Sequence, residues 1–201
     1  MGSQLHDVPT PSDGPERRKP SFKIRRAAPD DLAAVADIGS RVFSATFGHS
    51  VTEQQLQTYL DEAYSAAAIA ADFADPNKII IVATGSDGSS EGGARVVVVG
   101  FAQLTQGSRE PCVEHLPAAI ELQRLYVDSA FHGQGVGSVL MQEAERVARG
   151  LGCGNIWLGV WEENHRAQAV YAKLGFSKVG KHDFDVGGDI QTDEILVKAL
   201  A

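Results

Sequence analysis

Three closely spaced glycines give the strongest chemical signal in the sequence. A predicted strand runs into them and a predicted helix follows, in the segment Leu125-Tyr126-Val127-Asp128-Ser129-Ala130-Phe131-His132-Gly133-Gln134-Gly135-Val136-Gly137-Ser138. Glycine lets the backbone approach an anion without a Cβ in the way. The free amides and the dipole at a helix N-terminus favour negative charge. The backbone amides of residues 132–138 are therefore predicted to bind a phosphate or pyrophosphate.

Other phosphate-binding loops do not fit this glycine spacing. A P-loop requires a lysine after its glycines, and none follows here. The dinucleotide fingerprint G-x-G-x-x-G fails because the glycines fall at positions 133, 135 and 137. A tight strand-to-helix turn without any ligand is the alternative that the residues leave open.

A second polar and aromatic segment follows about thirty residues later. It reads Asn164-His165-Arg166-Ala167-Gln168-Ala169-Val170-Tyr171-Ala172-Lys173-Leu174-Gly175-Phe176. A helix is predicted from Asn164 to Leu174, ended by Gly175. Asn164 is a good N-cap, Tyr171 fits a buried helix face, and Lys173 fits a solvated one. Each of the three could instead contact a ligand at the glycine turn.

The two segments together resemble the GCN5-related N-acetyltransferase (GNAT) superfamily. His132-Gly133-Gln134-Gly135-Val136-Gly137 resembles its motif A, Q/R-x-x-G-x-G/A, with histidine in place of the usual Gln or Arg. The second segment resembles motif B, N-x-x-A-x-x-x-Y-x-x-x-G-F. Shorter stretches at 46–49, 121–127 and 156–162 resemble the PaiA-type subgroup, which includes polyamine acetyltransferases. The resemblance extends from Phe22 to the C-terminus.

This resemblance implies a fold, a cosubstrate and the residues that bind it. The fold is α/β, with a mixed, mostly antiparallel twisted sheet flanked by helices. The cosubstrate is acetyl-CoA, and no metal is involved. The implied binding residues are Leu125, Tyr126, Val127, His132, Gly133, Gln134, Gly135, Val136, Gly137, Ser138, Asn164, Ala167, Tyr171 and Lys173.

Acetyl transfer to an amine requires a neutral amine and a protonated leaving thiolate. By the resemblance, Tyr171 is the catalytic acid, because family members place this hydroxyl near the CoA sulfur. Glu121, on the strand that leads to the glycines, is the candidate base. Glu162 or a water chain is the alternative, and His49 and His132 are weaker candidates.

The expected reaction moves an acetyl group to a primary amine of a small molecule by direct attack in a ternary complex. A polyamine-like acceptor is favoured, and peptide or protein amines remain open. A non-catalytic acyl-CoA-binding or sensing module is the alternative class. Tyr126, Trp161, Phe43, Phe47 and the 106–117 loop are candidates for the acceptor site. The acids Asp183, Asp185 and Asp189 could attract a cation or simply form a polar turn.

Strand and helix signals alternate along the chain. Strands are expected at 22–26, 78–84, 95–104, 120–127, 155–161, 176–181 and 190–198. Helices are expected at about 32–43, after the capping box at Thr52, at 66–74, and from the glycines to about Arg149. A long flexible hairpin loop is expected at 85–93. Residues 1–20, rich in proline, read as a disordered tail before a single domain at 21–201.

Composition excludes several classes of protein. The chain has 201 residues and a formal net charge of −8, which argues against a nucleic-acid partner. Two cysteines outside any zinc spacing argue against a disulfide scaffold or a structural zinc. No apolar run reaches the roughly 18 residues of a membrane helix, and no signal-peptide core is present. A cytoplasmic enzyme without membrane contact is expected, possible as a homodimer.

Overall fold

The computed structural model describes residues 22–87 and 95–200. The predicted tail at 1–20 and most of the predicted hairpin loop at 85–93 lie outside these residues. Both cysteines, Cys112 and Cys153, are free thiols. Among the described residues, no helix combines the length and apolar character needed to cross a bilayer.

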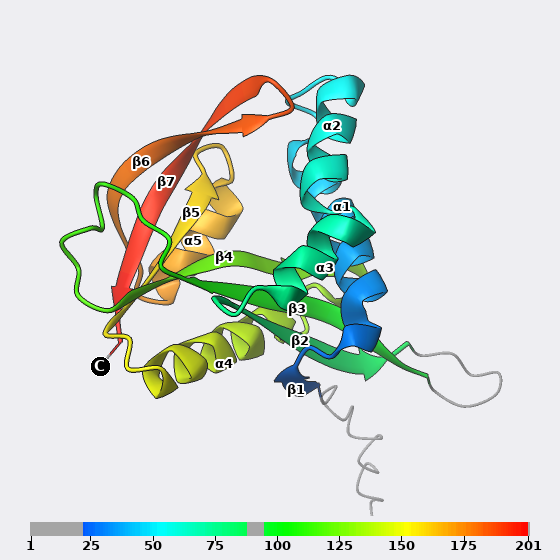
Figure 1. The fold of residues 1–201 in the computed structure, drawn as a ribbon, viewed down its shortest axis with the longest axis horizontal. Coiled ribbons are helices and arrows are strands. Elements are labelled where there is room, and N and C mark those ends of the chain that lie inside the picture. The colour runs from blue at the N-terminus through cyan, green and yellow to red at the C-terminus, as the bar shows by residue number, and fades with distance from the viewer. Residues whose placement is uncertain (1–21, 88–94, 201) are drawn as a thin grey trace, which may run out of the picture.

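One seven-stranded sheet forms the centre of the molecule, in the order β1-β2-β3-β4-β5-β7-β6 (Figure 1). All neighbouring strands are antiparallel except β4 and β5. The expected mixed, mostly antiparallel sheet is therefore confirmed. The strands are β1 (Lys23–Arg26), β2 (Lys78–Ser86), β3 (Val96–Gln106), β4 (Ala119–Val127), β5 (Asn155–Trp161), β6 (Ser177–Val186) and β7 (Asp189–Ala199).

The parallel strands β4 and β5 pair over a short distance and then diverge (Figure 1). Their pairing ends where Glu121 lies beside Trp157. Just beyond, the β3–β4 register shifts so that Gln123 is opposite no residue of β3. Such a bulge bends a strand and increases its local twist. The edge of β4 that faces β5 is consequently unpaired from Leu122 to its end.

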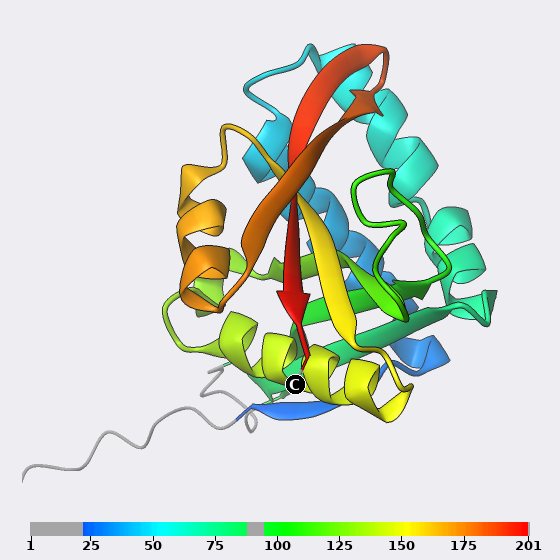
Figure 2. The same cartoon turned by 90° about the vertical axis from the view of Figure 1, so that its left-hand side faces the viewer.

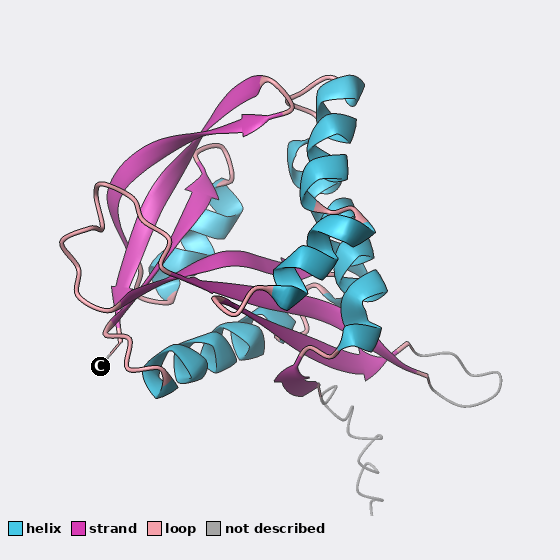
Figure 3. Ribbon diagram, in the orientation of Figure 1, coloured by secondary structure: helices cyan, strands magenta, loops and turns pink. Residues whose placement is uncertain are grey.

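Helices cover the two faces of the sheet (Figure 3). Alternate β2 residues divide between two cores: Ile79 and Ile81 pack with α4, whereas Ile80 and Val82 pack with α1 and α3. This division follows from the two-residue period of a strand. The helices are α1 (Leu32–Phe47), α2 (Glu53–Ala63), α3 (Ala66–Ala74), α4 (Val136–Gly150) and α5 (His165–Lys173), with short 3-10 turns at Pro29–Asp31 and Ser129–Phe131.

The expected helix starts are confirmed by their caps. The Thr52 hydroxyl accepts from the Gln55 amide at 3.3 Å, and the Gln55 side chain accepts from the Thr52 amide at 2.9 Å. The Ser65 hydroxyl accepts from the Ala68 amide at 3.2 Å and so caps the start of α3, which makes α2 and α3 separate helices. The helix α1 extends four residues beyond its predicted end at Phe43, because Phe47 still packs on Phe43 with ring centroids 4.4 Å apart.

The β6–β7 hairpin is longer than the sequence predicts. Polar residues such as His182 and Asp183 lie within β6, where an end at residue 181 was expected. The strand continues because Asp183 is paired with Thr192, whose hydroxyl donates to Asp183 Oδ1 at 2.9 Å. Side-chain partners thus compensate for the weak hydrophobic pattern of this edge strand.

Candidate active site

A cavity of about 990 Å³ lies where β4 and β5 diverge. The end of β4, the N-terminal turn of α4, the helix α5 and one face of α1 form its walls. The lining side chains and backbone come from Arg41, Val42, Ala45, Thr46, His49, Leu125, Val127, Ser129, Phe131, His132, Gly133, Gly135, Val136, Gly137, Ser138, Trp161, Glu163, Asn164, Arg166, Ala167, Val170, Tyr171 and Leu174. Most of the predicted cosubstrate residues are therefore brought together.

The glycine turn presents backbone amides to this cavity. Gly133 and Gly135 have φ of 76° and 87°, a region that residues with a Cβ rarely adopt. The first amide to bond within α4 is that of Val139, which donates to the Gly135 carbonyl at 3.1 Å. The amides of residues 136–138 precede it and have no partner inside the helix. This arrangement fits an anion.

The His132 side chain holds the glycine turn in place. Its Nε2 lies 3.0 Å from the Val127 carbonyl at the end of β4. The ring thus connects the end of β4 to the glycine turn. His132 also lines the cavity. This contact accounts physically for a histidine at a position where the resemblance expects Gln or Arg.

The helix α5 forms the opposite wall. The Asn164 side chain accepts from the Ala167 amide at 3.1 Å, so Asn164 is an N-cap and also lines the cavity. Tyr171 lies two turns further along and packs edge-on against Phe176. Burial raises the pKa of Tyr171 to about 12, and the charge of Asp193 adds to this rise. The hydroxyl therefore keeps its proton at neutral pH.

The strands β4 and β5 separate beyond the pair of Glu121 and Trp157, and we call this gap the split. A group of acids lies near its start, under the loop that joins β3 to β4. Burial raises the pKa of Glu121, although a hydrogen bond from Ser108 in this loop opposes the rise. The loop is fixed by Val113, which packs on Trp157 and Ile195, and by Glu110, whose Oε1 lies 2.7 Å from His182 Nδ1. Figure 2 shows this loop and α5 on opposite sides of β5 and β7.

Asp193 on β7 belongs to the same group of acids. Burial raises its pKa to about 7, with His182 opposing the rise and Glu121 adding to it. No motif in the sequence marks this residue. The available signal is an acid two residues before Ile195 and four before Val197, on the strand face that these apolar residues share.

The rings of Trp161 and His49 line the cavity next to α1, and two phenylalanines outside the lining pack near them. Trp161 lies 4.9 Å from Phe47 and 5.6 Å from His49, measured between ring centroids. Phe184 packs edge-on against Phe47. The Trp161 indole donates to Gln191 Oε1 at 2.9 Å, which fixes the ring. Phe43 is instead a core residue, buried and stacked on Phe47 and Tyr59.

Comparison with known proteins identifies the family. The model of the acetyltransferase (GNAT) family matches residues 44–176, which include both the glycine turn and α5. The chain belongs to this family. An acyltransferase enzyme, as the two motifs predict, is therefore confirmed, and acetyl-CoA is the acyl donor with which GNAT proteins are solved.

Relatives of this GNAT protein cover nearly its whole described length. An uncharacterized N-acetyltransferase of Mycobacterium tuberculosis is 32% identical over 85% of this chain and 97% of its own. Streptothricin acetyltransferase of Streptomyces lavendulae is 26% identical, over 80% and 84%. The PaiA N-acetyltransferase of Thermoplasma acidophilum, solved in complex with coenzyme A, has a TM-score of 0.66 at 21% identity, covering 89% of this chain and 99% of its own.

Three residues predicted to bind the cosubstrate do not line the GNAT cavity: Tyr126, Gln134 and Lys173. Tyr126 points to the other face of β4 from Leu125 and Val127, because strand side chains alternate. Its hydroxyl lies 2.9 Å from that of Tyr64. The Gln134 side chain donates back to the Ala130 carbonyl at 3.1 Å, and Lys173 is exposed on α5.

Glu162 is the alternative candidate for the base, and Asp185 and Asp189 are candidates for attracting a cation. All three have polar partners at the surface. Glu162 pairs with Lys181 at 2.6 Å on the outside of the sheet. Asp185 accepts from the Gly188 amide at 2.5 Å, and Asp189 accepts from Gln191. The acids of the hairpin therefore form its polar turn, which is the plainer of the two interpretations. Within residues 22–87 and 95–200, no group of His, Cys, Asp and Glu could hold a metal.

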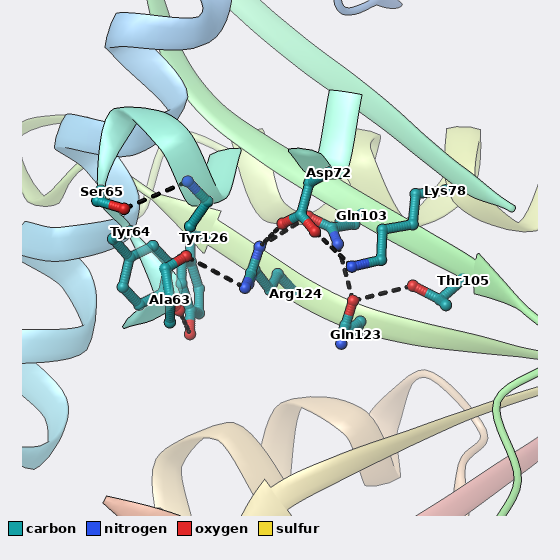
Figure 4. Close-up of polar contacts among 11 residues, drawn as sticks. Ala63, Tyr64, Ser65, Asp72, Lys78, Gln103, Thr105, Gln123, Arg124 and Tyr126 are labelled. Atoms are coloured by element: carbon teal, nitrogen blue, oxygen red, sulfur yellow. Dashed lines mark hydrogen bonds and ion pairs between the residues drawn. The ribbon is translucent and has the colours of Figure 1, made fainter. Parts of the chain in front are cut away.

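A polar network ties α3 to β4 beside the site (Figure 4). Asp72 accepts from Lys78 and, at 2.6 Å, from Arg124. Burial acts to raise the pKa of Asp72, but the two cations outweigh it and hold the pKa below its usual value. Arg124 also lies over the Tyr64 ring, 4.9 Å from the centroid. The network fixes the strand that carries Leu125 against the α2–α3 corner.

Proposed function

We propose that this GNAT protein transfers the acetyl group of acetyl-CoA to a primary amine of a small, cationic, polyamine-like molecule. The amine attacks the thioester directly in a ternary complex. The observation that carries the proposal is a cavity lined by both the glycine turn and Tyr171, whose pKa the nearby charge of Asp193 helps to raise.

The proposed pyrophosphate site is the row of amides at residues 132–138, except those of His132 and Gln134, which donate to the Ser129 and Phe131 carbonyls at 3.2 and 3.4 Å. The described residues fit such a group, because the first turn of α4 leaves its amides free and the two positive-φ glycines keep side chains out of the turn. Arg166 lines the same cavity and supplies a positive charge. The unpaired edge of β4 at Leu125 and Val127 can pair with an extended amide-bearing arm, much as an added strand would.

The proposed chemistry divides two proton movements between different groups. Bound acetyl-CoA supplies a thioester whose carbonyl the amine attacks. Tyr171, with its pKa raised to about 12, stays protonated and donates a hydrogen bond to the departing sulfur. A buried carboxylate accepts the proton of the incoming ammonium, and Glu121 is the candidate named by the resemblance.

The charge and ring content of the site favour a cationic acceptor. Glu121 interacts electrostatically with both Glu110 and Asp193, and the chain as a whole carries a net charge of −8. Trp161, which lines the cavity and packs against Phe47, offers an aromatic ring to an alkyl ammonium. The name of one relative, streptothricin acetyltransferase, supports a small-molecule acceptor without identifying it.

The proposal is tested by the release of CoA thiol from acetyl-CoA in the presence of spermidine, a short peptide with a free N-terminus, or streptothricin. We expect turnover with spermidine, and a loss of about 100-fold in kcat for Tyr171→Phe with CoA affinity retained. Glu143→Gln, which removes an exposed ion pair with Arg146 on α4, is the matched control and should leave kcat unchanged.

Two results would overturn the proposed function. Turnover with the peptide alone would make the protein a peptide acetyltransferase. Binding of CoA without turnover on any of the three amines would make it an acyl-CoA-binding module.

A further inference from the structure

Asp193 occupies an unusual position in the divergence of β4 and β5. It pairs with Trp161 at the far end of β5, beyond the last β4–β5 pair at Glu121 and Trp157. Its carboxylate lies directly over Gly159: a Cβ at that glycine would come within 2.6 Å of Asp193 Oδ2. The absence of a side chain at Gly159 therefore makes the space that the carboxylate fills.

The buried oxygen of Asp193 lacks a partner. Among the described residues, two buried side-chain nitrogen or oxygen atoms have no hydrogen-bond partner, Trp157 Nε1 and Asp193 Oδ1. Both belong to the same face of the sheet, because residues paired across strands project to the same side. A buried carboxylate oxygen without a partner is costly in a folded protein. Such an atom is expected where a ligand supplies the missing donor.

Asp193 interacts electrostatically with titratable groups on four elements: Glu121 on β4, His182 on β6, Tyr171 on α5 and Tyr59 on α2. Glu110 from the β3–β4 loop pairs with His182 and turns that histidine towards the loop. Glu121 lies where the strands are still paired and receives a hydrogen bond from Ser108. Asp193 lies beyond that pairing and is the register partner of Trp161, which lines the cavity, whereas neither acid is itself among the lining residues.

We propose that Asp193, rather than Glu121, binds the acceptor ammonium and accepts its proton. This inference rests on the proposed function and deepens it, because it assigns the base of the same reaction. Glu121 then acts as a second negative charge that holds the ammonium near the split.

The acidity of Asp193 suits this role. Burial, with a contribution from Glu121, raises its pKa to about 7, whereas His182 opposes the rise. A general base is most effective when its pKa lies near the working pH. At neutral pH a large fraction of Asp193 is ionised and ready to accept a proton.

The protons balance in this scheme. Asp193 takes one proton from the ammonium, and the neutral nitrogen forms a bond to the thioester carbonyl carbon. The carbon–sulfur bond then breaks, and the sulfur receives the proton of Tyr171. The nitrogen, now an amide, returns its surplus proton to the Tyr171 oxygen. When product leaves, Asp193 releases its proton to solvent, so that one ammonium and one acetyl-CoA yield an amide, CoA thiol and a proton.

The test compares Asp193→Asn and Glu121→Gln with the wild type over pH 5.5–9, using spermidine and acetyl-CoA. We expect Asp193→Asn to lower kcat/KM for spermidine by about 10²- to 10⁴-fold. The variant should also lose the acidic limb of the pH profile, which is the fall in kcat/KM as the pH drops through about 7. The Kd for CoA, measured by calorimetry, should stay within about twofold. Glu121→Gln should raise KM and keep the limb.

A second variant guards against misfolding of Asp193→Asn. Gly159→Ala places a methyl group against Oδ2, displaces the carboxylate without removing it, and should also lower kcat/KM at unchanged CoA affinity. Glu194→Gln is the matched control, since it removes a neighbouring acid that pairs with Lys178 at 2.5 Å, and it should leave the profile unchanged.

The outcomes separate this inference from the proposed function. If the wild type acetylates spermidine and Asp193→Asn keeps both its rate and its limb near pH 7, Asp193 is not the base. If the limb disappears in Glu121→Gln instead, Glu121 holds that role. If the wild type binds CoA but acetylates no amine, the proposed function fails and the role of Asp193 fails with it.

Discussion

Tyr171 and Asp193 illustrate what a sequence reveals about single residues. Tyr171 stands in a recognisable spacing with Asn164 and Gly175, so its place near the glycine turn could be predicted. Asp193 has no such context, because its burial depends on Gly159 in a neighbouring strand and on a hairpin longer than the sequence indicates. Acids of equal prominence in the sequence, such as Glu162 and Asp185, turn out to have surface partners.

The raised pKa of Asp193 predicts a pH-dependent stability. The folded pKa of about 7 exceeds the ordinary value of 3.8, so the native state keeps a proton that the unfolded chain has lost. This contribution to stability is full below pH 3.8 and is lost as pH rises through 7. Between pH 5 and 8 the loss amounts to about 2–3 kcal/mol.

Asp193→Asn, which cannot ionise, removes this loss. In thermal unfolding from pH 5 to 8, we expect the melting temperature of the variant to rise relative to the wild type as pH increases. A constant difference between the two proteins over this range would show that Asp193 has an ordinary pKa.

At the scale of elements, the glycine turn and the starts of α2 and α5 were predictable, because their signals are local. Caps at Thr52 and Asn164 and positive φ at Gly135 are set by residues within one turn of each other. The divergence of β4 and β5 was not predictable from residue patterns. It depends on a bulge at Gln123 and on which strands become neighbours, and both are non-local properties.

The turn predicts an effect of Gly135→Ala on both stability and binding. A side chain at φ of 87° costs about 1 kcal/mol or more, and relaxation of the turn moves the amides that face the cavity. We expect the free energy of unfolding to fall by about that amount and the Kd for CoA to rise about tenfold or more.

Gly150→Ala provides the control, because Gly150 is the last residue of the same helix, has open space around it and does not line the cavity. Calorimetric titration with CoA should give the wild-type Kd for this variant. Equal affinities in the two variants would contradict the anion-binding role of the turn.

The network between α3 and β4 predicts a larger effect on folding. Asp72→Ala leaves Arg124 buried without its carboxylate partner, and breaking a buried pair in this way costs about 3–5 kcal/mol. Urea unfolding measures this loss. Asp37→Ala, which removes an exposed partner of Arg41, should cost less than about 1 kcal/mol. Similar losses in both variants would mean that the Asp72 network does not stabilise the fold.

The whole molecule combines an acidic chain with one anion-binding turn. The fold class and the family followed from two motifs in order along the chain. The length of the final hairpin and the position of the β3–β4 loop over β5 and β7 did not, since they depend on contacts such as Glu110 with His182. Composition indicated only the overall negative charge, and the structure gathers part of it near the split.

This charge predicts a salt effect on the acceptor. A net charge of −8 attracts a polyamine, and added salt screens that attraction. Between about 0.05 and 0.5 M NaCl we expect KM for spermidine to rise severalfold, with kcat changed much less. Butylamine, with a single charge, should show a smaller rise, and an equal rise for both amines would contradict the electrostatic account.

The initial rate of CoA thiol release, with acetyl-CoA and spermidine both varied, tests the central claim most directly. The proposed function predicts no release without the amine, saturation in both substrates, and double-reciprocal lines that intersect, as expected when both substrates occupy one cavity. Parallel lines, or thiol release that does not depend on the amine, would contradict direct acetyl transfer in the cavity between β4 and β5.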